Sequence, residues 1–206
     1  MGDARVGVVL VDHVTADEDR CSVAVDDVRG GELAGLHLID IGASRIAYVG
    51  GPDWIRQCTD RHAGLVRATE QAKQSVEILH VRVPALTWRA GYEAVPQLMD
   101  ARPDALFCAN DVVAIGVLRG LIERKVHVPK DIAIIGYDDI DFSSSSTVPL
   151  SSIRQPAYQI GKTSASLLLE EATSSGHAHQ QVLFRPELIT RASTKRLTRG
   201  RTKAVS

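Results

Sequence analysis

Three carboxylates stand within four positions at the end of an apolar run. The segment DIAIIGYDDID, residues 131–141, ends in Asp138, Asp139 and Asp141. An apolar run of this length predicts a buried strand, and ligands of open parallel α/β sheets bind just outside the carboxyl ends of the strands. The carboxylates are therefore candidate acceptors for the hydroxyl groups of a ligand.

Other polar side chains follow apolar runs in the same way. Asn110 ends the run ALFCAN, and Arg61 lies shortly after the turn GGPDWIRQ. An asparagine amide both donates and accepts hydrogen bonds, while arginine offers a planar fork of donors. With a carboxylate, this set suits vicinal hydroxyls, as on a sugar or ribose. Asp111 and Asp139 have an equally good structural interpretation, as a helix cap and as the start of a turn.

Clustered carboxylates also suit magnesium or calcium. The spacing of a calcium-binding EF-hand loop is absent, and Asp138, Asp139 and Asp141 cannot all point one way as the chain leaves a strand. We interpret His177 and His179 of the HAH segment as a solvated loop pair without further ligands. We therefore expect no metal site.

The sequence also lacks the signatures of an enzyme. Cys21, Cys58 and Cys108 are far apart and in no CxxC or Cys/His spacing, which argues against a disulfide framework or a zinc site and for free thiols. There is no GxxxxGK[ST], GxGxxG or GxSxG motif, and no nucleophile with its base. We expect no catalytic residues and no cofactor.

Length and composition describe a globular protein of one large or two small domains. The 206 residues are 44% hydrophobic and 24% charged, with a formal net charge of -1. Phosphate contacts require a basic surface, so this charge argues against nucleic-acid binding by the whole chain. No segment approaches the roughly 18 apolar residues of a membrane span, and the N-terminus lacks the regions of a signal peptide. We expect a cytoplasmic protein.

Short apolar runs alternate with amphipathic stretches along the chain. Continuous Val/Ile/Ala runs are typical of strands buried on both faces of a parallel sheet. The alternation predicts a doubly wound α/β architecture. The predicted strands span residues 6–12, 22–27, 45–51, 77–83, 105–111 and 132–139, and the predicted helices 28–41, 60–73, 89–100, 111–124 and 158–172.

Two polar segments interrupt this alternation. FSSSSTVP, residues 142–149, predicts a loop that crosses between lobes. EATSSGHAHQQ, residues 171–181, predicts a second loop before the extended segment 182–191, where Pro186 favours an edge strand or bulge. The basic end of the chain, residues 195–206, is typical of a disordered tail.

Seven segments then stand in a familiar order: VVLVD, VAVDDVRGGELAGLHLIDIGASRIAYVGGP, DRHAGL, ANDVVAIGVLRGL, VPKDIAIIGYDDIDF, VPLSSIRQP and FRPELITRAST. Together they closely resemble the lactose/galactose-repressor (LacI/GalR) family of bacterial transcription regulators. The resemblance runs without large gaps from about residue 6 to residue 194. Each segment alone is a weak signal, but seven in order and spacing are specific.

The resemblance implies a periplasmic-binding-protein-like effector domain, in which two doubly wound parallel-sheet lobes clamp a sugar or nucleoside-like metabolite. Family effector contacts carry over onto Arg61, which stands three residues before Gly64. They also carry over onto Asn110 of the ANDVVA segment and Asp138 of the GYDD segment. Gln57, seven residues before Gly64, falls at a position that often lines the same cleft.

One position departs from the family pattern. The family tends to place an aromatic residue, which stacks on the ligand, five residues before the glycine of the next helix. Counting back from Gly91 gives Leu86 instead. Trp88, two residues away, can take over the stacking role, although a tryptophan beside a helix start is more often a packing residue. The class of ligand therefore stays open.

The resemblance also implies how the chain is divided. Residues 1–26 and 151–181 are assigned to an incomplete first lobe, residues 27–150 and 182–194 to a second lobe, and residues 195–206 to the tail. Family members begin with a helix-turn-helix DNA-binding domain, a hinge helix and further βα units, none of which precedes the VVLVD strand here. We expect a truncated regulator, such as a gene fragment or a misplaced start, with sheet edge and apolar surface exposed.

The predicted function is effector sensing in a LacI-type transcriptional repressor, with the operator DNA bound only by the intact parent protein. Family dimers use surfaces of both lobes, so a homodimer is a further expectation. The alternative is a stand-alone sugar-binding protein of the periplasmic type, which the missing signal peptide disfavours. A third alternative, a sugar-converting enzyme, lacks a recognisable acid/base or metal constellation.

Overall fold

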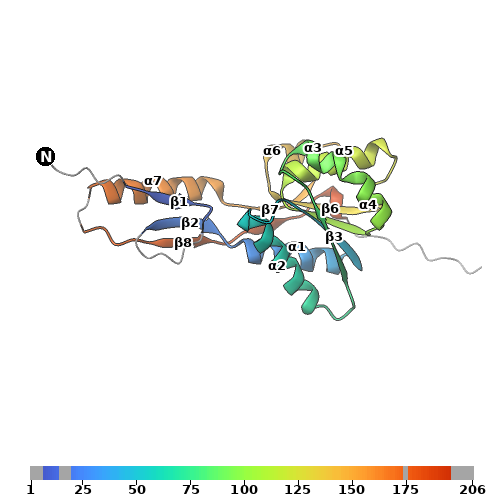
Figure 1. Cartoon of the computed structure of the whole chain (residues 1–206), viewed down its shortest axis with the longest axis horizontal. Helices are drawn as coiled ribbons and strands as arrows, with labels where there is room; N and C mark the ends of the chain where they lie inside the picture. The colour runs from blue at the N-terminus through green and yellow to red at the C-terminus, as the bar shows by residue number, and fades with distance from the viewer. Residues whose placement is uncertain (1–6, 14–19, 174–175, 196–206) are drawn as a thin grey trace, which may run out of the picture. The chain divides into compact units, whose positions relative to one another are not determined.

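The protein divides into two compact units. The structure, a computed structural model, describes residues 7–13, 20–173 and 176–195 (Figure 1). Unit 1 comprises Met1–Asp27 and Gln155–Pro186, and unit 2 comprises Val28–Arg154 and Glu187–Ser206. The predicted disordered tail, residues 195–206, lies outside the described residues except for Lys195.

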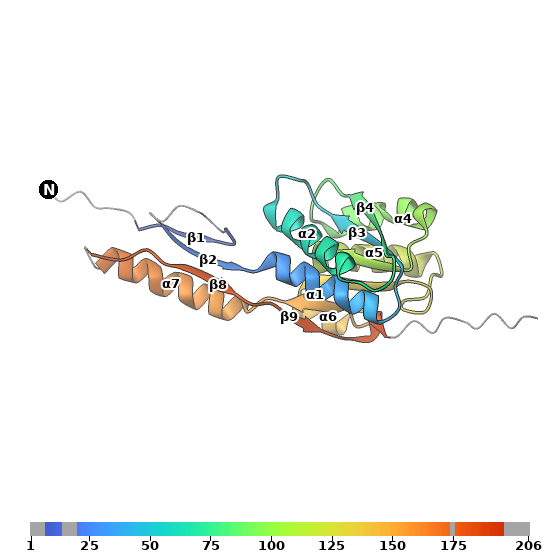
Figure 2. The same ribbon diagram turned by 90° about the horizontal axis from the view of Figure 1, so that it is seen from below.

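In the described part of unit 1, one helix packs beside a three-stranded parallel sheet. The strand order is β1 (Val9–Val11), β2 (Cys21–Val25), β8 (Gln181–Phe184), and α7 (Ala157–Thr173) packs beside it (Figure 2). The two chain segments of the unit meet where β2 pairs with β8. Its core cluster consists of Cys21, Val23, Val25, Ile160 and Leu167.

Unit 2 contains a six-stranded sheet in the order β4-β3-β5-β6-β7-β9. All neighbours are parallel except β7 and β9, which pair antiparallel. Apolar runs fill the central strands, as expected for strands buried on both faces. The strands are β3 (Arg45–Gly50), β4 (Glu77–Arg82), β5 (Ala105–Cys108), β6 (Ala133–Asp138), β7 (Ser151–Arg154) and β9 (Glu187–Ile189).

Helices cover both faces of this sheet and give it two cores (Figures 1 and 2). On one face, α1 (Asp27–Asp40) and α2 (Arg56–Glu70) supply Leu38 and Leu65 to a cluster around Tyr48 and Phe107. The helices of the other face supply Leu98 and Val113, among others, to the second cluster. These helices are α3 (Trp88–Glu93), α4 (Val95–Ala101) and α5 (Asp111–Glu123).

The chain passes between the units at other residues than we expected. Residues 151–154, expected in the first lobe, form β7 of unit 2, where Ser152 donates a hydrogen bond to the buried Asp111 (2.7 Å). Residues 182–184, expected in the second lobe, belong to β8 of unit 1, because Val182 and Phe184 pack against its core.

Local structure also differs from the expectation at three places. The predicted helix 89–100 is two helices, α3 and α4, with Pro96 in the first turn of α4, where proline is tolerated. The predicted loop 142–149 overlaps a short helix, α6 (Asp141–Ser145). Pro186 was expected within an edge strand or bulge of one extended segment. It lies between β8 and β9, which belong to different sheets.

Candidate functional site

Arg61 is held in place by the close crossing of α1 and α2. A Cβ atom added at Gly31 would lie 2.0 Å from the carbonyl oxygen of Arg61, and one added at Gly64 would lie 2.0 Å from that of Val28. Only glycine allows this approach of two helix backbones. The crossing leaves Arg61 only 5% exposed.

The guanidinium group of Arg61 lies at the carboxyl ends of β5 and β6. Its Nη1 donates a hydrogen bond to the carbonyl oxygen of Ala109 (2.7 Å), and its Cζ lies 3.6 Å from the ring centroid of Tyr137. Its Nη2 lies 3.7 Å from Oδ1 of Asp138. A buried charge needs such partners, and together they orient the planar fork of donors. Arg61 is thus a preorganised donor at the strand-end edge of the sheet.

Asp138, the last residue of β6, has a strained backbone. Its φ is 102°, in the left-handed region that disfavours residues with a Cβ. Strain of this kind costs on the order of 1–3 kcal/mol and is found where binding requires a fixed geometry. The side chain is 30% exposed, and its 3.7 Å separation from Arg61 exceeds the roughly 2.7–2.9 Å of a charge-assisted hydrogen bond. One ligand hydroxyl could therefore engage both groups.

Asp139 has a structural role. Its side chain is 4% exposed and accepts hydrogen bonds from Arg154 Nε (2.8 Å) and Arg191 Nη1 (2.6 Å). Burial opposes ionisation of Asp139, but the bonds from Arg191 and Arg154 outweigh it and hold its pKa below the usual range. The pairs join β7 and the segment after β9 to the end of β6. Asp141, the third carboxylate, is exposed in the first turn of α6.

The helix cap that we expected at Asp111 is formed by its neighbour. Asn110 caps α5, since its Oδ1 accepts a hydrogen bond from the amide of Val113 (2.9 Å). Asp111 is fully buried instead of capping, and accepts bonds from Ser143 Oγ (2.6 Å), Ser152 Oγ (2.7 Å) and the amide of Ile140 (3.0 Å). Burial raises the pKa of Asp111 to about 6 despite these donors. Asp111 therefore ties the backbone beyond Asp138 to α5 and β7.

The other two expected ligand residues lie at helix starts. Gln57 is half-buried in the first turn of α2, four residues before Arg61 and so on the same face of the helix. Trp88 begins α3 and is 47% exposed, with the guanidinium of Arg119 5.6 Å from its ring. Leu86, at the position of the family aromatic, packs against both core clusters of unit 2. The roles of Gln57 and Trp88 in binding remain predictions.

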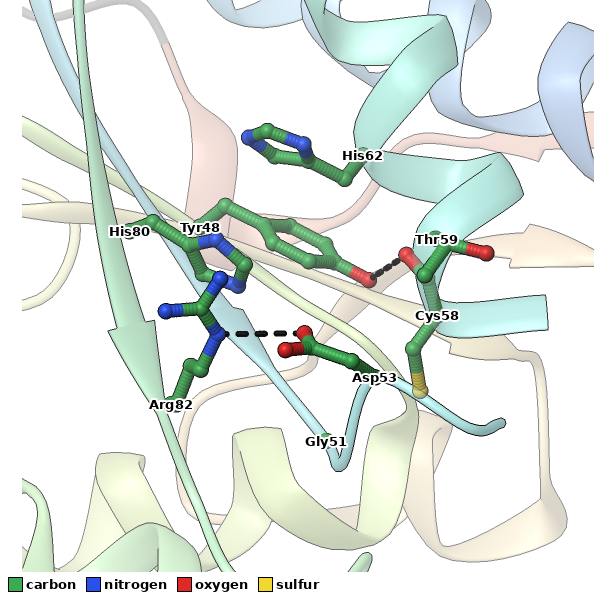
Figure 3. Close-up of a pocket in the computed structure, with 8 residues that line it drawn as sticks. All are labelled: Tyr48, Gly51, Asp53, Cys58, Thr59, His62, His80 and Arg82. Atoms are coloured by element: carbon green, nitrogen blue, oxygen red, sulfur yellow. Dashed lines mark hydrogen bonds and ion pairs between the residues drawn. The ribbon is translucent and has the colours of Figure 1, made fainter. Parts of the chain in front are cut away.

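Unit 2 also contains a cavity that the sequence did not reveal. It has a volume of about 190 Å³ and includes none of the five expected ligand residues. The rings of His62 and His80 stack across it at 4.7 Å, and Asp53 accepts a hydrogen bond from Arg82 (3.0 Å) (Figure 3). Its size is below the roughly 300 Å³ of typical ligand pockets. The lining residues are Tyr48, Gly51, Asp53, Cys58, Thr59, His62, His80 and Arg82.

The structure corrects our interpretation of His177 and His179 as a pair without further ligands. Sγ of Cys21 lies 3.0 Å from Nε2 of His177 and 3.8 Å from Nδ1 of His179. The residues are separated by 156 and 158 positions in the sequence, so no local spacing could have indicated the cluster.

Comparisons with known proteins identify the class and then the family. Residues 36–194 match the family described as a periplasmic binding protein-like domain, which agrees with the parallel α/β sheets. A LacI family transcriptional regulator from Enterococcus faecalis V583, solved with bound ribose, is 30% identical with a TM-score of 0.86. The match covers 93% of this chain and 69% of that chain. The chain belongs to the LacI/GalR family, and both the resemblance and the fold class predicted from the sequence are confirmed.

Curated relatives are named as transcriptional repressors. The chain is 33% identical over 190 residues to the ribose operon repressor of Escherichia coli (strain K12), covering 91% of this chain and 58% of that protein. It is 37% identical over 171 residues to the repressor PurR of Haemophilus influenzae (strain PittEE), covering 81% and 51%. The chain thus spans somewhat more than half the length of these relatives. Among the described residues, no helix is long and apolar enough to cross a membrane.

Proposed function

We propose that this chain senses a small sugar as the effector domain of a LacI-type transcriptional repressor. In this proposal Arg61 and Asp138 make the main polar contacts with the sugar hydroxyls. Asn110 and Gln57 complete the polar lining, and Trp88 stacks on the sugar. Units 1 and 2 belong to the first and second lobes of the family fold. The comparison with a regulator solved with bound ribose makes ribose the first candidate.

The arrangement of Arg61 and Asp138 carries the proposal. A buried guanidinium, fixed by Ala109 and Tyr137, lies 3.7 Å from a partly exposed carboxylate with strained backbone. A sugar hydroxyl can accept a hydrogen bond from the first group and donate one to the second. Because both groups are charged, each bond contributes about 1.5–3 kcal/mol, enough to select polyhydroxylated ligands.

Calorimetric titration of the 206-residue chain with ribose, other pentoses, hexoses and nucleosides tests this proposal. We expect saturable binding of one of these compounds. Asp138→Asn keeps the size of the side chain but removes its charge. The loss of one charge-assisted hydrogen bond should weaken sugar binding by about 10- to 100-fold. Arg61→Lys should weaken it similarly, because lysine cannot reproduce the planar fork.

Two exposed residues provide matched controls. Arg67 lies on the same helix as Arg61, and Asp141 lies three positions after Asp138. The control variants are Arg67→Lys and Asp141→Asn. Both variants should bind the sugar as the wild type does. Equal affinity in wild type, Asp138→Asn and Arg61→Lys, or no sugar binding by a chain that unfolds cooperatively, would contradict the proposal.

The proposal extends to the intact parent protein. There the sugar would shift the equilibrium between two lobe arrangements and so change the affinity for operator DNA, which requires different sugar affinities in the two states. Such a regulator acts on DNA in the cytoplasm and does not convert its ligand. Release of an unchanged sugar after prolonged incubation, measured by NMR, tests the last point; appearance of a new sugar would contradict it.

A homodimer is also part of the proposal. Phe142 and Ile122 of unit 2 are 70% and 39% exposed, and a dimer interface would bury such apolar side chains. Sedimentation of the chain over a range of concentrations should show a monomer–dimer equilibrium. A monomer at all concentrations up to the millimolar range would contradict dimer formation by this chain.

A further inference from the structure

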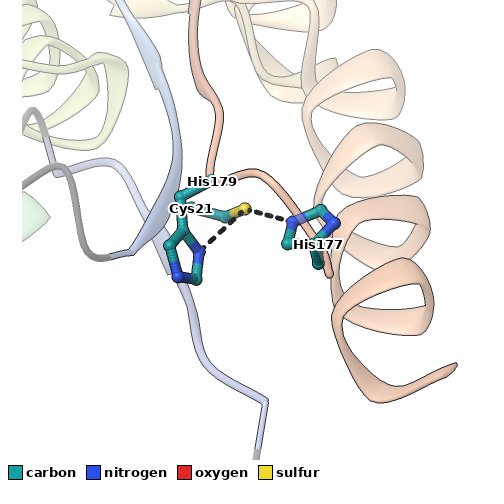
Figure 4. Close-up of side chains that lie close together, drawn as sticks. All are labelled: Cys21, His177 and His179. Carbon is teal, nitrogen blue, oxygen red and sulfur yellow. Dashed lines mark hydrogen bonds between the residues drawn. The ribbon is translucent and has the colours of Figure 1, made fainter. Parts of the chain in front are cut away.

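We propose that Cys21, His177 and His179 form a zinc-binding site in unit 1. Figure 4 shows the sulfur of Cys21 between the two imidazole rings. The one sulfur and two nitrogen ligand atoms all lie within 4.8 Å of one another. Such a group of potential ligands is the arrangement that zinc sites with three protein ligands use.

The pairing of two strands brings these side chains together. Cys21 is the first residue of β2, and His177 and His179 lie four and two residues before the start of β8 at Gln181. The parallel register pairs Ser22 with Gln181, and the amide of Ser22 donates a hydrogen bond to the carbonyl oxygen of Gln180 (2.9 Å). The cluster therefore lies at the amino ends of the strands and is separate from the carboxyl ends, where ligands of such sheets bind.

The distances suit a metal ion after a small adjustment. Zn–S and Zn–N bonds of about 2.3 and 2.0–2.1 Å at tetrahedral angles require S···N separations of roughly 3.5 Å. The observed separations from Cys21 Sγ are 3.0 Å to His177 and 3.8 Å to His179. His179 is exposed, so its ring can move to complete the site.

The surroundings favour zinc over a purely hydrogen-bonded cluster. Thiolate and imidazole are typical ligands of zinc, whereas magnesium and calcium bind mainly to oxygen atoms. Oε2 of Glu170 lies 4.0 Å from Nδ1 of His177. A small movement of the Glu170 side chain would let it accept a hydrogen bond from this ring, as carboxylates beside metal-bound histidines do. Three protein ligands leave a fourth position for water. On binding, the Sγ–H bond of Cys21 breaks, the proton passes to the buffer, and the sulfur lone pair forms the Zn–S bond.

A zinc ion here would join the two chain segments that make unit 1. Cys21 belongs to Met1–Asp27 and the histidines to Gln155–Pro186. Among the residues that the structure describes, the core cluster between these segments has five buried members. Small cores commonly need a metal or disulfide to add stability. Zinc would thus stabilise unit 1, independently of any sugar bound to unit 2.

Cobalt and zinc titrations of the metal-free, reduced 206-residue chain test the site. We expect one equivalent of Co²⁺ to produce the thiolate charge-transfer absorption and the visible bands of tetrahedral cobalt, and Zn²⁺ to abolish both. Cys21→Ser should lose the charge-transfer band and bind Zn²⁺ at least 100-fold more weakly. His179→Ala, which alters only an exposed side chain, should weaken Zn²⁺ binding while the fold persists.

Matched controls and a second measurement complete the design. Cys58→Ser and His127→Gln alter a buried cysteine and an exposed histidine of unit 2, and both should bind Zn²⁺ as the wild type does. Hydrogen exchange should slow in β2 and β8 on adding Zn²⁺ and stay unchanged in β5 and β6. An unchanged spectrum with Co²⁺ would show that the cluster is only a Cys–His hydrogen bond. A charge-transfer band that survives in Cys21→Ser would show that another thiol binds the metal, and would equally overturn the proposal.

Discussion

Units 1 and 2 bury their apolar residues in different ways. Unit 2 covers both faces of its sheet with helices and has two large core clusters. The part of unit 1 that the structure describes has a single cluster of five buried residues, and Val11 and Leu183 of its sheet are 49% and 54% exposed. Since stability grows with the apolar area removed from water, unit 2 should be the more stable of the two.

The two units also differ in how many polar residues they bury. Among the described residues, Ser22 is the buried polar residue of unit 1, whereas seven lie in unit 2. Buried polar groups that are fully hydrogen-bonded fix a single arrangement of their elements. Unit 2 therefore has the rigidity that a preorganised binding site needs. The seven residues are Arg61, Asp111, Ser143, Ser151, Ser152, Ser193 and Thr194.

Truncating one leucine in each unit tests whether they unfold separately. Leu106 is 0% exposed in unit 2, and Leu106→Ala should lower the free energy of unfolding of unit 2 by about 4 kcal/mol through loss of contacts and a residual cavity. Leu167→Ala should lower that of unit 1 by about 2–3 kcal/mol. Urea unfolding followed by hydrogen exchange measures both. If either variant destabilised both units equally, the division into a strong and a weak unit would be wrong.

Asp111 tests how far the polar network stabilises unit 2. Asp111→Ala leaves Ser143, Ser152 and the amide of Ile140 without their acceptor and should cost about 3 kcal/mol at pH 7, measured by urea unfolding. Asp111→Asn keeps the shape and serves as the control. A loss below about 1 kcal/mol in Asp111→Ala would show that the network adds little.

The raised pKa of Asp111 also predicts a pH dependence. Its pKa rises from 3.8 in the unfolded chain to about 6 in the folded one, so the folded protein binds the proton more tightly. The stabilisation from that proton is present below pH 4 and is lost as the pH rises through about 6. The stability of the wild type relative to Asp111→Asn should fall over this range, by up to about 3 kcal/mol. A constant difference would contradict the raised pKa.

The sequence predicted features that depend on local patterns and missed those that depend on contacts between distant residues. Apolar runs predicted most of the strands, and the family resemblance together with the strand-end rule selected Arg61, Asn110 and Asp138. The sheet to which β7 and β8 belong was not predictable, since short strands are placed by distant partners. The buried position of Asp111 depends on Gly136, where a Cβ would lie 2.0 Å from its Oδ1. Such contacts across the fold leave no local pattern in the sequence.

Asp138→Gly tests whether the site of unit 2 stores strain. Glycine adopts a φ of 102° without the cost that a Cβ imposes, so the variant should raise the free energy of unfolding by about 1 kcal/mol. Sugar binding should nevertheless be lost, because the carboxylate is gone. Asp138→Asn keeps the strain and should not be stabilised. Thermal unfolding and sugar titration of both variants check this, and a destabilised Asp138→Gly would mean that the contacts of the carboxylate outweigh the strain.

The stacked histidines of unit 2 give the smallest expected effect. Burial lowers the pKa of His62 and His80, and the nearby charge of Arg82 lowers both further. Groups with a lowered pKa contribute stability above pH 6.5 that is lost as the pH falls through the folded pKa, opposite in sign to Asp111. Arg82→Gln should therefore raise the pKa of both histidines in an NMR titration. It should change stability at pH 7 by less than about 0.5 kcal/mol, because the Arg82–Asp53 pair is exposed. Unchanged histidine titrations would show that burial, and not the charge of Arg82, lowers these pKa values.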